Sequence, residues 1–194
     1  MTVPYHSPPS SSSTPSASSS NSRLQPFLLL AQSTRPRGAA AAKLVQQVTE
    51  ASGVYGFGEL LSIPGVPELQ DSEHSASFRL FKLFAYGTLS DYKRSPQDYP
   101  PLSDAQLEKL RRLSLVSLAM DRRVLAYDLL FEELDIPSRQ IRELEDLIID
   151  ATYDGLVSGR MDQIQSCFQV ESVVGRDVIE DEQLEELFNK LDDW

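Results

Sequence analysis

The chain has 194 residues, and 29 Asp and Glu against 18 Lys and Arg give it a formal net charge of −11. Such a surface repels phosphate backbones and anionic headgroups, which argues against nucleic acid and membranes as partners. The single cysteine, Cys167, cannot form an internal disulfide and fits a reducing compartment. The longest apolar run, residues 27–31, falls well short of the roughly 20 residues that span a bilayer.

The first half of the chain divides into a polar tail and a helical part. Residues 1–22 contain ten Ser and four Pro with almost nothing to bury, which predicts a disordered tail, either passive or phosphorylated. Residues 23–102 have apolar residues at helical spacing, and we expect helices over 24–32, 38–51, 57–62 and 77–92. The last of these is apolar on several sides and must be surrounded. Such a series of short helices predicts a helical-repeat stack.

Residues 103–178 begin with the element order of a winged helix. Ser103 and Gln106 have the spacing of a capping box, which predicts the start of a helix. A short apolar strand over 124–126, a helix over 128–134 and a tight turn over 135–137 follow.

The second half of this module predicts the recognition helix and the wing. A long amphipathic helix runs from Ser138 to Gly159, and strands over 161–165 and 168–173 form a hairpin with Cys167 at its turn. Residues 179–194 form a further amphipathic helix. The predicted fold is therefore mostly α, in the α+β class: a helical-repeat part, a winged helix and a C-terminal helix.

The long helix has an apolar and an acidic side. Its expected buried stripe is Ile141, Leu144, Ile148 and Ala151, with Leu147 beside them. Its other side carries Glu143, Asp146, Asp150 and Asp154 at i, i+3, i+7 and i+11. In a DNA-reading winged helix these carboxylates would meet phosphates, which Arg139 and Arg142 do not offset. The module is therefore predicted to dock proteins rather than DNA.

The sequence offers no catalytic, metal or cofactor site. Its two histidines, His6 and His74, form no zinc-binding motif. Gly53, Gly56 and Gly58 lack the spacing and the Lys-Ser/Thr ending of a phosphate loop. The many carboxylates are interpreted as a solvated face, and Cys167 as a packing or edge residue.

The hairpin and the final helix are the predicted partner interface. The apolar residues of the second hairpin strand are Phe168, Val170 and Val173, in a sheet whose outer edge either pairs with another chain or remains an ordinary exposed edge. The final helix places Leu184, Leu187, Phe188 and Leu191 on one face, while residues 178–194 have a net charge of −6. This helix either folds back or joins a bundle with other chains, and its terminal position favours the bundle.

Several sequence blocks resemble PCI domains. In the helical part they are the blocks at 55–61 (YGFGELL) and 78–88, and in the winged part those at 144–151, 159–163 and 174–178. The first two blocks and Gly175-Arg176-Asp177 look most like the subunit-seven family of the COP-nine signalosome. The resemblance spans roughly residues 26–178.

This resemblance implies a scaffold subunit in a hetero-oligomer of the cytoplasm and nucleus. The signalosome removes the ubiquitin-like modifier Nedd-eight from cullins, and its zinc isopeptidase is a different subunit. The expected neighbours are the PCI subunit four and the MPN-type subunit six, joined through winged halves and a shared helix bundle. The chain ends at Trp194, where family members usually continue the last helix, so the bundle contact stays open. Alternatives are a PCI scaffold of translation initiation factor three or of the proteasome lid and, more remotely, a winged-helix nucleic-acid binder.

Overall fold

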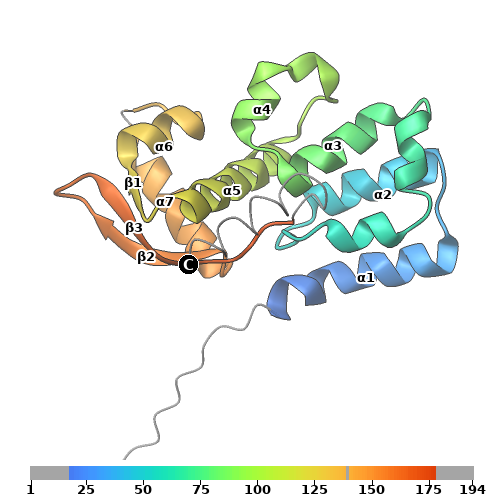
Figure 1. The fold of residues 1–194 in the computed structure, drawn as a ribbon, viewed down its shortest axis with the longest axis horizontal. Coiled ribbons are helices and arrows are strands. Elements are labelled where there is room, and N and C mark those ends of the chain that lie inside the picture. Colours follow the sequence, from blue (N-terminus) through green and yellow to red (C-terminus); the bar gives the residue numbers. More distant parts are fainter. Residues whose placement is uncertain (1–17, 139, 178–194) are drawn as a thin grey trace, which may run out of the picture.

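The computed structural model describes residues 18–138 and 140–177 (Figure 1). In this part the α-helices are α1 (Ser18–Thr34), α2 (Ala39–Glu50), α3 (Ser75–Tyr86), α4 (Leu89–Arg94), α5 (Asp104–Asp121), α6 (Tyr127–Glu133) and α7 (Ile141–Tyr153). The 3₁₀ helices are η1 (Gly58–Ser62), η2 (Pro67–Asp71) and η3 (Pro96–Asp98), and the strands are β1 (Val124–Ala126), β2 (Val157–Asp162) and β3 (Cys167–Val173). In Figure 1, α1 to α3 lie at one end, the sheet with α6 and α7 at the other, and α5 between them. The predicted fold class is confirmed.

Aromatic rings form the core of the helical half. Phe57, which precedes η1, lies 6.4 Å from Phe81 and 6.1 Å from Phe84 between ring centroids, and all three rings are fully buried. Both partners belong to α3, which is therefore enclosed on several sides, as its sequence predicts.

The predicted helix over 77–92 is wrong, because two helices occupy this stretch. Helix α3 ends at Tyr86, and Gly87 turns the chain into an extended conformation. Thr88 and Asp91 then form a capping box at the start of α4, in which the Asp91 carboxylate accepts from the Thr88 N–H at 2.9 Å. Local capping chemistry thus overrides a continuous apolar pattern.

Helix α5 is the central element, in contact with α2, α4, α7, β1 and β3. Its predicted capping box is confirmed: the side chains of Ser103 and Gln106 each accept from the other's backbone N–H. Gln106 Nε2 also donates to the buried Thr49 hydroxyl at 2.8 Å. One turn later, Lys109 is 3% exposed and donates to two carbonyls at the end of α2, at 3.0 and 2.6 Å. Helix α5 thereby satisfies the C-terminal carbonyls of α2.

The recognition helix is shorter than the predicted span from Ser138 to Gly159. Helix α7 begins at Ile141 and ends at Tyr153. The end is set by Gly155, whose φ of 73° reverses the chain toward β2, a conformation that favours glycine.

Strand β3 is the middle strand of an antiparallel sheet with the order β1-β3-β2. Cys167 opens β3, pairs with Ala126 on one side and Asp162 on the other, and is buried. The prediction that Cys167 lies at the hairpin turn is therefore wrong. The turn occupies residues 163–166 and closes on Ser166, whose φ is 49°. The first strand of the hairpin, β2, therefore ends at Asp162, close to residue 161, where the sequence predicts that this strand begins.

Two further predictions concern the two ends of the chain. Helix α1 begins at Ser18, inside the stretch 1–22 predicted as a tail, and residues 1–17 lie outside the described part. The final helix, with Leu184, Leu187, Phe188 and Leu191, also lies outside the described residues. Within residues 18–138 and 140–177, no helix is long and apolar enough to cross a membrane.

Candidate partner-binding surface

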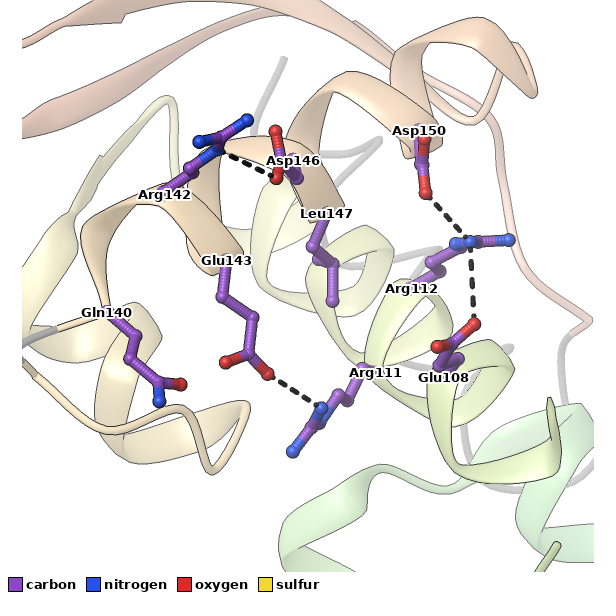
Figure 2. A pocket seen from close by; sticks show the side chains of 9 residues that line it. All are labelled: Glu108, Arg111, Arg112, Gln140, Arg142, Glu143, Asp146, Leu147 and Asp150. Carbon is purple, nitrogen blue, oxygen red and sulfur yellow. Dashed lines mark hydrogen bonds and ion pairs between the residues drawn. The ribbon is translucent and has the colours of Figure 1, made fainter. Parts of the chain in front are cut away.

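A pocket of about 400 Å³ lies between α5 and α7 (Figure 2). Figure 2 shows the arginines of α5 turned toward carboxylates of α7. Arg111 pairs with Glu143 at 3.3 Å, and Arg112 pairs with Asp150 at 3.0 Å and with Asp154 at 3.3 Å. The two arginine side chains are only 17% and 19% exposed, so solvent screens these pairs less than pairs on an open surface.

The acidic stripe of α7 is therefore not an open acidic face. Glu143, Asp150 and Asp154 pair with arginines of α5, and Asp146 pairs within α7 with Arg142 at 3.8 Å. The sequence prediction of an uncompensated acidic stripe misses these pairs, because α5 supplies cations that the sequence of α7 does not reveal. The pocket is lined by mutually neutralising groups, which gives it no strong attraction for an anion.

Tyr55 extends this ion-pair cluster to the helical half. Its hydroxyl donates to the Asp154 carboxylate and accepts from Arg112 Nη1 at 3.3 Å. Burial of the side chain is the main cause that raises the pKa of Tyr55 to about 12, and the hydrogen bond to Asp154 is the second. The hydroxyl therefore keeps its proton and stays a donor. The three residues connect the loop before η1 with α5 and α7.

A second connection is the strap, which we define as residues 174–177 after β3. Arg176 donates to the carbonyls of Phe84 at 2.8 Å and Gly87 at 2.7 Å and to the Ser117 hydroxyl at 2.7 Å. Burial lowers the pKa of Arg176 to about 10, while Asp177 and Asp91 act in the opposite direction. The guanidinium thus binds the carbonyl end of α3, where a cation is favoured.

Asp177 completes the strap at the aromatic core. Its carboxylate accepts from the Phe57 N–H at 2.6 Å. A Cβ added to Gly58 would lie 3.0 Å from Asp177 Oδ1, so glycine leaves room for this close approach. The strap and Tyr55 together fix the winged half against the helical half.

The predicted interface residues of the hairpin lie inside the protein. Phe168 is 1% exposed and Val170 is 7% exposed, on the middle strand of the sheet, whereas Val173 is half-buried at its end. Placing these residues at an exposed sheet edge is therefore wrong, because β1 and β2 pair with both sides of β3. Among the described strands, the edges belong to β1 and β2.

Most of the exposed large apolar side chains among the described residues lie on the winged half, apart from Leu29 and Leu30 of α1. Tyr153 is 87% exposed at the end of α7 and Ile164 is 97% exposed at the hairpin turn, and Val124 is 58% exposed on β1. The buried stripe of α7 is confirmed at Leu144, Ile148 and Ala151, but Ile141 is 50% exposed because it stands at the first position of the helix. Exposed apolar groups beside a sheet edge are typical of a protein-binding surface.

The described residues contain no group of three or more His, Cys, Asp or Glu side chains that could hold a metal ion.

Two family models match the chain. The CSN7 helical bundle subdomain matches residues 25–58, and the PCI domain matches residues 87–172. The chain is a PCI-domain protein that resembles COP9 signalosome subunit 7. Mouse COP9 signalosome complex subunit 7a is 45% identical over 168 residues, which are 87% of this chain and 59% of the mouse protein. Subunit 7 of Dictyostelium discoideum is 35% identical over 171 residues, 88% of this chain and 64% of that protein.

Other PCI assemblies are represented by weaker matches. Eukaryotic translation initiation factor 3 subunit M of Yarrowia lipolytica is 28% identical over 160 residues, 78% of this chain and 39% of that protein. A non-ATPase regulatory subunit 13 of the 26S proteasome from Dictyostelium discoideum is 24% identical over 155 residues, 73% of this chain and 39% of that protein. The chain spans less than two thirds of the length of the signalosome relatives compared above.

Proposed function

We propose that the chain is a non-catalytic scaffold subunit of the signalosome, the complex that removes a ubiquitin-like modifier from cullins. The isopeptidase belongs to another subunit in this proposal. The observation that supports the scaffold role best is the winged half, where β2 has one neighbour among the described strands and the exposed Tyr153 and Ile164 lie just before and just after β2 in the chain. The names of the relatives identify the complex to which such a scaffold would belong.

Edge-to-edge packing is the proposed mechanism of assembly. A strand with one neighbour presents backbone donors and acceptors that a strand of another winged half can pair with. Tyr153 and Ile164 would bury their exposed side chains in the same contact, which supplies the apolar part of the interface. The buried Phe168 and Val170 support this edge from within rather than touching the partner.

The proposed neighbours are the PCI subunit four and the MPN subunit six, in the cytoplasm and nucleus. The C-terminal helix would contribute its apolar face, made of Leu184, Leu187, Phe188 and Leu191, to a helix bundle shared with other subunits. Neither nucleic acid nor membrane takes part in this proposal.

The test is a pull-down of the tagged chain from its own cells, with partners identified by mass spectrometry. We expect the other signalosome subunits and cullin-deneddylating activity in the eluate. Tyr153→Asp and Ile164→Asp should each lower this recovery about tenfold, because a buried interfacial charge costs at least one to two kcal/mol. Leu29→Asp, a change at a 61% exposed leucine of α1, is the matched control and should leave recovery unchanged.

Other results would assign the chain to another complex or contradict the proposed role. Recovery of initiation-factor or proteasome subunits would keep the PCI scaffold and change the complex. Equal recovery with the winged-half variants and with Leu29→Asp would contradict the proposed edge. Metal-dependent hydrolysis by the purified chain alone would contradict the non-catalytic role.

A further inference from the structure

A groove of about 430 Å³ lies between α1 and the segment that follows η1. Its apolar lining comes from Leu28 and Ala31 of α1 and from Ile63 and Pro64 after η1. Two cations, Arg35 and Arg37, and one carboxylate, Glu59, also line it. The groove is separate from the winged half, so the proposed scaffold edge does not use it.

The groove belongs to a basic stretch of an acidic protein. Residues 23–49 contain four basic residues and no Asp or Glu, in a chain with a net charge of −11. Arg35 is exposed, and Arg37 has an exposed pairing with Glu68 at 3.7 Å, which an incoming carboxylate can replace at small cost. An apolar groove beside such arginines fits an acidic amphipathic segment.

The strap ends close to this groove, just before the C-terminal segment, residues 178–194. Asp177 is bound to the N–H of Phe57, the residue before η1. The other end of η1, at Ser62 and Ile63, lines the groove. A 3₁₀ helix rises about 2 Å per residue, so these two points are separated by roughly 10 Å. The segment therefore leaves the described part of the chain within one or two helical turns of the groove.

The C-terminal segment has the composition that the groove requires. It holds seven Asp and Glu and one Lys, and its apolar residues Leu184, Leu187, Phe188 and Leu191 share one helical face. Seventeen residues in a helix would extend about 25 Å, more than enough to reach from the strap along η1 to α1.

We propose that residues 178–194 fold back and occupy the groove between α1 and η1 in the free chain. Leu187 and Phe188 meet the apolar lining, and the neighbouring Glu185 and Glu186 approach Arg35 and Arg37. This contact keeps an apolar helix out of solvent until another chain competes for it. The proposal concerns the free chain and does not depend on the identity of the complex.

Hydrogen–deuterium exchange of the purified full chain tests the proposal. Backbone amides over 27–35 and 61–66 should exchange about tenfold more slowly in the wild type than in Leu187→Asp/Phe188→Asp, which prevents apolar docking. Arg35→Glu/Arg37→Glu should raise exchange in the same peptides. Adding Glu185→Lys/Glu186→Lys to that variant should restore the protection, because the charge pairing is then reversed on both sides.

Arg122→Glu/Arg123→Glu is the matched control, since it reverses two exposed charges at the far end of α5. It should leave the exchange of both peptides unchanged. Wild-type exchange equal to that of Leu187→Asp/Phe188→Asp would overturn the fold-back contact, and so would failure of the charge swap to restore protection. Because no partner is present, the result is independent of the pull-down that tests the scaffold role.

Discussion

Replacement of Arg176 by Met tests whether the strap joins the two halves of the protein. Methionine keeps much of the apolar stem and removes the guanidinium, which makes three hydrogen bonds of 2.7–2.8 Å to α3, to Gly87 and to α5. Charge-assisted bonds contribute ~1.5–3 kcal/mol each. The drop in the pKa of Arg176 to about 10, in which burial outweighs the opposite effect of Asp177 and Asp91, corresponds to a net cost of roughly 3 kcal/mol. Subtracting this cost from the contribution of the three hydrogen bonds predicts that Arg176→Met lowers the free energy of unfolding by ~2–6 kcal/mol.

Urea unfolding and thermal melts of the purified chain measure this loss. For a chain of this size each kcal/mol lowers the midpoint by about 2–4 °C, so we expect a decrease of roughly 5–20 °C. Arg160→Met is the control, because Arg160 is 82% exposed and forms a surface pair with Glu171, which contributes at most about 1 kcal/mol. If Arg176→Met and Arg160→Met had equal, small effects, the strap would not stabilise the junction.

Three further changes address the core. The pKa of Lys109 is lowered to about 7 by burial, so above that pH the unfolded chain binds more protons than the folded one. The free energy of unfolding should therefore rise by about 3 kcal/mol from pH 7 to about pH 9.5, and Lys109→Met should abolish this rise in urea titrations. Phe168→Ala should cost ~3–5 kcal/mol in the free chain, because the ring is fully buried; a ring used only for partner contact would cost little in the same titration. Gly159→Ala should disrupt the hairpin and lower its protection from hydrogen exchange, because the added Cβ would lie 2.1 Å from the Gln169 carbonyl oxygen; unchanged protection would contradict this packing.

The features that the sequence predicted correctly arise from residues that lie close together in the chain. The capping box of Ser103 and Gln106, the strand over 124–126 and the buried Leu144 and Ile148 each follow from spacing within one element. The predicted C-terminal end of α7 was wrong because Gly155 ends the helix by its backbone conformation, and helical periodicity in the side chains does not record where that occurs.

The contacts between the two halves were missed for a different physical reason. Arg112 lies 38 residues before Asp150, and Arg176 lies 92 residues after Phe84, so no local pattern pairs them. The sequence block around Arg176 resembles the family, which marks the residue without giving its role. A buried arginine among carbonyls can be recognised only when the helix end that it binds has been placed.

The use of cations at the junction explains how an acidic chain can offer a rigid docking block. Lys109, Arg111, Arg112 and Arg176 all have largely buried side chains and bind groups on neighbouring elements. Separating a buried charge from its partner costs several kcal/mol of stability, so relative motion of the two halves is costly. In the proposed assembly, a partner that pairs with β2 would meet an edge whose orientation is already fixed. Little further ordering entropy is then lost on binding, which favours assembly through a small contact.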